Sequence, residues 1–194
     1  MVLRKYGLEL HSLTVDDLEL VRKWRNDDFI QERMLLQDEI SSEDQKRWFA
    51  QLDNSTIYLL IYHEGLKIGL VNVREINWEK RTGEAGIFIG DPNYRNSYIP
   101  MLVILCLMDV FFYEFEFSKL KAKVRADNSD ALHFNRELGY TVESLGEEFI
   151  NLVVNESGYT EHKEKLNPFL LKFDSDKLKH EFSQEEKDYL FPLK

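Results

Sequence analysis

The chain has 194 residues, a formal net charge of −10, and 43% hydrophobic and 13% aromatic residues. This composition favours one packed globular domain and argues against a disordered chain, which would lack the apolar residues needed for a core. The negative charge argues against nucleic acid and anionic membrane surfaces as partners, because both select proteins with a basic face.

Cys106 is the single cysteine, and its place in the apolar run MLVILCLMD predicts a buried side chain rather than a reactive one. An internal disulfide is excluded, so a reducing cytoplasm is expected. The first ten residues, MVLRKYGLEL, lack the apolar core of a signal peptide. The apolar run Met101–Phe112 is too short for a membrane span and contains Asp109. The histidines show no metal-ligand spacing, so no metal site is predicted.

The first half of the chain predicts one strand, then two helices, then three strands. LELHSL alternates apolar and polar residues and predicts a strand. Two amphipathic helices follow, the first capped by Thr14 and Asp17 and the second by a capping box of Ser42 and Gln45. TIYLLIYHEGLKIGLVNVREI contains two β-rich runs around the turn HEG and predicts a hairpin. GEAGIFIG is a third, adjoining strand.

The second half opens with the loop DPNYRNSYIP, and a helix is predicted to begin at Ile99–Met101 with its N-terminus facing a cleft beside GEAGIFIG. SKLKAKVRA alternates strictly and predicts a strand, while NSDALHFNRELGY predicts a helix. EEFINLVV and NPFLLKF are interpreted as a hairpin that turns across Asn155–Gly158. The charged tail is predicted to be helical around Gln184–Leu190.

Three segments of this mixed α+β pattern resemble the GNAT N-acetyltransferase superfamily, in the branch with ribosomal-protein and nucleotide-sugar N-acetyltransferases. They are LTVDDLELVRKWRND, GEAGIFIGDPNYR and NSDALHFNRELGYTVE, the last being the most specific. The resemblance implies a twisted, mostly antiparallel sheet of about seven strands flanked by helices. Residues 1–173 are expected to form this domain, and residues 174–194 a charged, partly helical tail packed on it.

The resemblance implies acetyl-CoA as co-substrate, its pyrophosphate held by a glycine-rich loop and the helix that follows. Here that loop has no glycine: Arg95 matches the family, but Tyr98 and Pro100 replace small residues. Pro100 lacks an N–H, and Tyr98 would be strained if the site required a positive φ. By this resemblance the cofactor contacts are Ile87, Phe88, Ile89, Arg95, Asn96, Ser97, Tyr98, Ile99, Asn128 and Asn135.

Acetyl transfer to an amine needs a base or a water chain to take the ammonium proton. Glu84, in the GEAGIFIG strand, is the predicted base and Glu75 the alternative, while a solvated strand-edge charge is the competing interpretation of Glu84. Asn135 stands where the family places a tyrosine as leaving-group acid, and an amide can only hydrogen-bond to a thiolate. Three tyrosines are substitute acids: Tyr94, Tyr98 and Tyr140.

The first two helices carry the predicted acceptor-binding residues: Trp24, Arg25, Asn26, Arg33, Met34 and Trp48. The aromatic rings would stack on a sugar or base, and Arg25 or Arg33 would face a diphosphate. The alternative is that the two tryptophans anchor amphipathic helices in the core.

Three functions follow in order of preference. The first is an acetyl-CoA-dependent N-acetyltransferase for a small-molecule amine such as an amino-sugar nucleotide. The second is acetylation of a protein N-terminus, because the acidic chain would attract a basic protein tail. The third is a non-catalytic module with the same fold and a lost cofactor site. A homodimer is left open.

Overall fold

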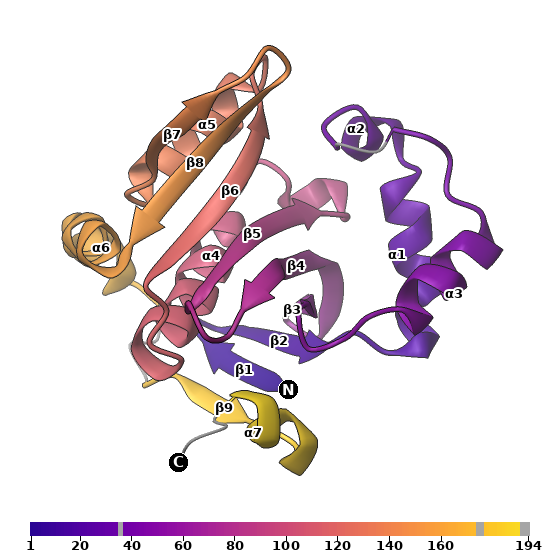
Figure 1. Cartoon of the computed structure of the whole chain (residues 1–194), viewed down its shortest axis with the longest axis horizontal. Helices are drawn as coiled ribbons and strands as arrows, with labels where there is room; N and C mark the ends of the chain where they lie inside the picture. The colour runs from indigo at the N-terminus through magenta and orange to yellow at the C-terminus, as the bar shows by residue number, and fades with distance from the viewer. Residues whose placement is uncertain (35–36, 174–176, 191–194) are drawn as a thin grey trace.

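The computed structural model describes residues 1–34, 37–173 and 177–190, and a nine-stranded sheet forms its centre (Figure 1). The strand order is β7-β8-β6-β5-β4-β3-β2-β1-β9, and β5 and β6 are the one parallel pair among the described strands. The strands are β1 (Val2–Lys5), β2 (Leu8–Ser12), β3 (Ile57–His63), β4 (Leu66–Asn77), β5 (Thr82–Ile89), β6 (Lys119–Arg125), β7 (Thr141–Leu145), β8 (Phe149–Asn155) and β9 (Lys179–Glu181).

Helices connect these strands on both faces of the sheet. They are η1 (Val15–Asp17), α1 (Leu18–Arg25), α2 (Asp28–Gln31), α3 (Ser42–Ala50), η2 (Pro92–Tyr94), α4 (Ile99–Asp109), the π-helical turn η3 (Val110–Glu114), α5 (Ser129–Glu137), α6 (Glu156–Leu170) and α7 (Gln184–Leu190). The predicted start of α4 and the predicted helix in the tail are confirmed. Residues 174–176 and 191–194 of the predicted tail lie outside the described residues.

The prediction of about seven strands is wrong because three strands carry weak signals. β1 has only four residues, and β9 has three residues that are all polar. β7 is exposed along its whole length, so no buried face imposes an alternating pattern. The turn before β2 is built from Tyr6 and Gly7, both with positive φ, which folds β1 back onto β2.

The predicted hairpin across Asn155–Gly158 is also wrong, because a helix begins there. The side chain of Asn155 accepts a hydrogen bond from the amide of Gly158 at 2.9 Å, so this asparagine is a helix N-cap and not a turn residue. Strand β8 pairs antiparallel with β7 on one side and with β6 on the other. The cap of α3 likewise lies one residue before the predicted box: Ser41 accepts from the amide of Asp44 at 3.1 Å.

The two faces of the sheet bury different helices because successive strand residues point to opposite sides. On one face, α1 and α3 pack on Leu60 and Leu70, with Trp24, Trp48 and Tyr58 around them. On the other face, nearly all of α4 is buried against residues such as Leu59, Ile61, Val71 and Val73. Helices α5 and α6 contribute apolar side chains to this second, larger cluster.

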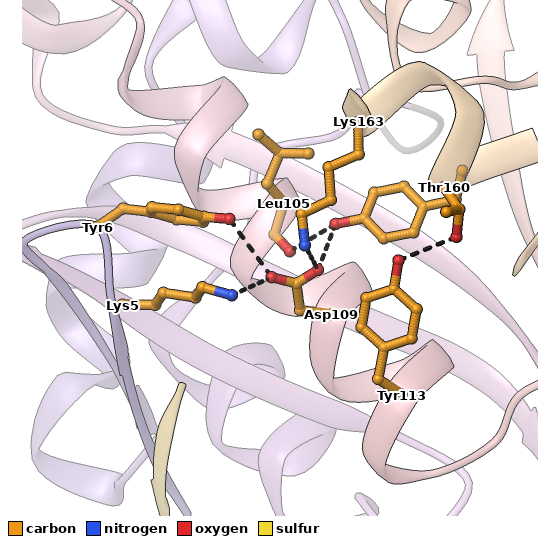
Figure 2. A network of polar contacts seen from close by, with 8 residues as sticks. Lys5, Tyr6, Leu105, Asp109, Tyr113, Thr160 and Lys163 are labelled. Carbon is orange, nitrogen blue, oxygen red and sulfur yellow. Dashed lines mark hydrogen bonds and ion pairs between the residues drawn. The ribbon is translucent and has the colours of Figure 1, made fainter. Parts of the chain in front are cut away.

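Asp109, at the end of α4, is a buried carboxylate that joins three distant segments (Figure 2). It accepts hydrogen bonds from Lys5 at 2.5 Å and Tyr6 at 3.4 Å, beside β1. From α6 it accepts a hydrogen bond from Tyr159 at 2.7 Å and forms an ion pair with Lys163. Burying one carboxylate between two ammonium groups and two hydroxyls compensates its desolvation, so this network is a structural clamp.

Candidate functional site

Strands β5 and β6 diverge after a short common stretch (Figure 1). Their pairing runs over Thr82–Glu84 of β5 and Lys119–Lys121 of β6. The rest of β5 stays paired with β4 up to Ile89. One edge of β5 therefore carries backbone groups beyond Glu84 that β6 does not pair with.

Glu84 is the last residue of β5 that pairs with β6, and its carboxylate binds Arg74 of β4 at 2.5 Å. The glutamate side chain is 15% exposed, so it is not a freely solvated charge. An acceptor amine that is to reach this carboxylate must displace Arg74 or exchange its proton through water. The alternative base, Glu75, is exposed at an irregularity of β4 where its φ is +50°.

Tyr58 of β3 lies in the same polar cluster. The strand register places it beside Asn72 of β4, and Asn72 lies over Gly86 of β5. Burial raises the pKa of the Tyr58 phenol, while Arg74, Arg25 and a hydrogen bond with Trp48 act in the opposite direction. The indole of Trp48 meets the phenol ring edge-on at 4.8 Å.

Arg25, the last residue of α1, lies near enough to this cluster for its charge to interact with Tyr58 and Arg74. Its Nε atom is buried, and within the described residues its guanidinium forms no hydrogen bond or ion pair. Burial lowers the pKa of Arg25, and the neighbouring guanidinium of Arg74 lowers it further while Tyr58 acts in the opposite direction. The cluster therefore holds two guanidinium groups and one carboxylate.

The other predicted acceptor residues have structural contacts. Trp24 packs on the backbone of Gly90, where an added Cβ would come within 2.1 Å of the indole. The side chain of Asn26 donates to the carbonyl of Ile40 at 2.9 Å and accepts from the amide of that residue.

Arg33 lies over the ring of Phe29 and donates to the backbone carbonyl oxygen of Phe29. Trp24 and Trp48 both pack in the apolar cluster under α1, and Met34 is half-buried.

Arg95, in the predicted cofactor loop, is turned toward its own chain. Its Nη2 donates to Asp27 at 2.9 Å and to the carbonyl of Gly90 at 3.0 Å, and its Nε donates to the carbonyl of Ile89 at 3.3 Å. The guanidinium also lies 4.5 Å from the centre of the Phe29 ring. The side chain thus fastens the end of β5 to the segment around α2, and a phosphate contact stays a prediction.

The first turn of α4 uses its amide groups within the chain. The amide of Ile99 donates to the hydroxyl of Ser97 at 3.2 Å. The amides of Met101 and Leu102 donate to the carbonyl of Tyr98 at 3.1 and 3.3 Å. Pro100, which lies between Ile99 and Met101, has no N–H. Of the amides that a helix start normally leaves for an anion, those of Ile99 and Met101 are therefore already bound.

Tyr98 is the N-cap of α4, with φ −76° and ψ −9°. This backbone conformation is accessible to every residue, so the condition for strain at Tyr98 is not met. Its ring lies 6.1 Å from that of Phe169 and 4.9 Å from that of Phe173, measured between centroids. Because Asp109 at the other end of α4 meets the start of α6, the two helices run antiparallel side by side.

The predicted residues of α5 cap or brace that helix. The side chain of Asn128 accepts from the amide of Ala131 at 3.0 Å, and the amide group of Asn135 donates to the carbonyl of Ala131 at 2.8 Å. Among the substitute acids, Tyr140 is buried, and burial raises the pKa of its phenol. Tyr94 meets His63 edge-on at 5.6 Å. Asn96 is exposed in the loop.

The structure adds three residues that the sequence interpretation missed: Tyr58, Asn72 and Arg74. The alternating patterns of β3 and β4 could have indicated two of these residues. Tyr58 lies on the same face of the sheet as Leu60, and Asn72 lies on the same face as Leu70. Polar residues at positions that otherwise continue a buried face are candidates for a site.

Other features add little to this site. A shallow cavity of about 720 Å³ is lined by residues at the start of α6 and touches none of the predicted site residues. No helix in the described ranges is long and apolar enough to cross a membrane. Among those residues no group of three His, Cys, Asp or Glu side chains is placed to hold a metal ion.

A family model described as an acetyltransferase (GNAT) domain matches residues 7–141. The spermidine N(1)-acetyltransferase of Escherichia coli is 34% identical over 101 residues, which cover 51% of this chain and 54% of that protein. The chain thus spans about half the length of that relative. The acetyltransferase PseH of Campylobacter jejuni is 25% identical over 159 residues, which cover 81% of this chain and 96% of PseH.

Solved structures share the fold. The spermidine N-acetyltransferase of Vibrio cholerae in complex with CoA and spermine superposes with a TM-score of 0.74 at 22% identity, covering 80% of this chain and 99% of that one. A domain from Methanocaldococcus jannaschii gives a TM-score of 0.69 at 21% identity, covering 76% and 97%. At these identities the likeness concerns the architecture alone.

Proposed function

Because the chain belongs to the GNAT acetyltransferase family, we propose that it transfers an acetyl group from acetyl-CoA to the primary amine of a small molecule, such as an amino-sugar nucleotide. The observation that carries this proposal is the divergence of β5 and β6 at Glu84. The divergence leaves a strand edge for an extended ligand arm and lies next to the cluster of Arg25, Tyr58, Arg74 and Glu84.

The residues at the divergence fit the pantetheine arm of acetyl-CoA. The backbone of Ile87–Ile89 would supply hydrogen-bonding groups along the unpaired edge of β5. The pyrophosphate end fits less well, because the first-turn amides of α4 already have partners inside the chain. Binding there requires these hydrogen bonds to open, which predicts weaker affinity than a glycine-rich loop would give.

Glu84 is the side chain best placed to receive the proton that the acceptor ammonium loses, directly or through water. Arg74 holds the carboxylate in one orientation until the acceptor arrives. Acetyl-CoA would supply the acetyl group and leave as a thiolate, which is tolerable near neutral pH because a thiol pKa is about 8.5.

The non-catalytic module is the second candidate, and the closed hydrogen-bond set at the start of α4 supports it. Calorimetric titration with acetyl-CoA separates the two. A heat of binding for acetyl-CoA supports the enzyme. No heat and no thermal shift at millimolar acetyl-CoA would remove the enzymatic proposal and leave the module.

The role of Glu84 is tested by Glu84→Gln. We expect kcat to fall about 10²-fold, the contribution of a general base, with little change in Tm because the amide oxygen of glutamine can still accept a hydrogen bond from Arg74. Glu143→Gln is the matched control, since it removes an exposed carboxylate that binds Lys121. Full activity of Glu84→Gln would transfer the role to water or to Glu75.

A further inference from the structure

The polar cluster of Arg25, Tyr58, Arg74 and Glu84 contains two guanidinium groups and one carboxylate, so it has one positive charge without a partner. Neighbouring arginines have carboxylate partners: Arg22 binds Glu19, and Arg95 binds Asp27. Arg25 has no such partner within the described residues, although the chain contains 35 acidic residues against 25 basic ones. A missing partner is therefore not explained by a shortage of carboxylates.

An arginine in this position carries an energetic cost. Its Nε is buried without a hydrogen bond, and a second guanidinium stands nearby. Burying an unpaired cation is unfavourable, and so is placing two like charges together. Both costs disappear when an anion enters between the guanidinium groups, because a guanidinium binds carboxylates and phosphates through paired N–H donors.

We propose that Arg25 and Arg74 together bind an anionic group, a carboxylate or a phosphate, carried by the amine that the protein acetylates. This inference rests on the proposed function. The hydroxyl of Tyr58 and the side chain of Asn72 supply further hydrogen-bonding groups on the same face. Arg74 also binds Glu84, so an anion held by Arg74 keeps the amine close to the carboxylate at the strand divergence.

The proposal separates this chain from polyamine acetyltransferases. A polyamine carries positive charges only, and the pair of guanidinium groups would repel it. An anionic acceptor is attracted to the same pair and can release Glu84 from Arg74 by replacing it as the partner of the guanidinium. Arg33 has no part in this site, because its guanidinium lies on Phe29.

The test measures anion binding to the full chain by calorimetry, with saturating CoA present to fill the proposed cofactor site. Pyrophosphate probes the phosphate source, citrate the carboxylate source, and spermidine the cationic alternative. We expect one of the two anions to bind, spermidine not to bind, and Arg25→Gln to raise the Kd of the anion at least tenfold. Arg47→Gln, which removes an exposed arginine of α3, should change the Kd by less than twofold.

Stability measurements distinguish a binding role from a structural one. If Arg25 only supported the fold, Arg25→Gln would lower Tm and weaken all ligands alike. We expect Tm to stay equal or rise, because the variant removes a partly buried cation without a partner, and Arg25→Lys to retain part of the anion affinity. Binding of spermidine, or anion binding unchanged in Arg25→Gln, would overturn the inference. Loss of acetyl-CoA binding alone would overturn only the proposed function.

Discussion

Tyr98 has a different role in the structure from the one expected from the sequence. In the sequence it replaces a glycine of the family's cofactor loop and would be strained at positive φ. In the structure it caps α4 with an unstrained backbone, and its ring packs against α6, although 49% of the residue stays exposed. The family difference at this position is therefore explained by an aromatic contact with a helix near the end of the chain.

Replacing Tyr98 by glycine should therefore destabilise the protein. We expect Tyr98→Gly to lower the free energy of unfolding by about 1–3 kcal/mol, since it removes aromatic contacts with Phe169 and Phe173 and relieves no strain. Urea denaturation of Tyr98→Gly and of the control Tyr98→Phe measures this. A glycine variant more stable than the parent would mean that the loop is strained after all.

At the same scale, the site could be predicted only in part. Glu84 could be put forward as the base because it lies in a segment that resembles the family, and this role stays a prediction. Arg74 and Tyr58 were not predicted, because their position near Glu84 depends on the register between β3, β4 and β5. No local sequence pattern determines that register. The partners of Arg95 could not be predicted either, because Asp27 is 68 residues away in the sequence.

At the scale of elements, local chemistry was the most reliable signal. The cap predicted from Thr14 and Asp17 is confirmed: the carboxylate of Asp17 accepts hydrogen bonds from the amide and hydroxyl of Thr14 at 3.0 and 2.5 Å. The error at α6 arose from the same chemistry, because asparagine followed by glycine suits both a turn and a helix cap. Only tertiary packing against α4 selects the helix.

The cap gives a prediction about pH. Burial alone would raise the pKa of Asp17, but hydrogen bonds from Lys67 and Thr14 outweigh it and lower the pKa. A lowered pKa stabilises the fold above the unfolded-state pKa, and this stabilisation is lost as the pH falls through the folded-state pKa. We expect Asp17→Asn to cost about 1 kcal/mol at pH 7, the difference between a charged and a neutral hydrogen-bond acceptor.

That cost should begin to shrink below about pH 4, where the carboxyl group of the unfolded chain takes up a proton, and should vanish once the pH falls below the lower pKa of the folded state. Chemical denaturation of both proteins at pH 7 and at lower pH measures the difference. The control is Asp16→Asn, a neighbouring acid that is exposed. A difference that stays constant down to pH 3 would contradict the assignment.

At the scale of the whole molecule, the clamp at Asp109 holds the larger core together. Asp109→Ala leaves Lys5 and Lys163 buried without their anion. We expect a loss of about 3–5 kcal/mol, as for other buried ion pairs deprived of one partner, from a total that is only about 5–15 kcal/mol for a domain. Urea denaturation measures it, and Asp127→Ala, which removes an exposed ion pair with Arg125, should change stability little.

If Asp109→Ala were as stable as the parent, the two lysines would have to reach solvent in the folded state. The double change Lys5→Met with Lys163→Met in the Asp109→Ala background tests the same explanation by removing the two lysines that have lost their anion. It should restore part of the lost stability, because apolar replacement of a buried ionic group is often neutral or stabilising.

The divergence of β5 and β6 divides the sheet into two mechanical bodies. Strands β9 and β1–β5 form one hydrogen-bonded block and β6, β8 and β7 another, and they share only Thr82–Glu84 and its partners. Asp109 spans the boundary, since Lys5 is the last residue of β1 and Lys163 lies in α6, the helix that follows β8. Amide hydrogen exchange should therefore resolve two cooperative opening units, with the β7–β8 block exchanging first, and a ligand wedged between the blocks should slow exchange in both.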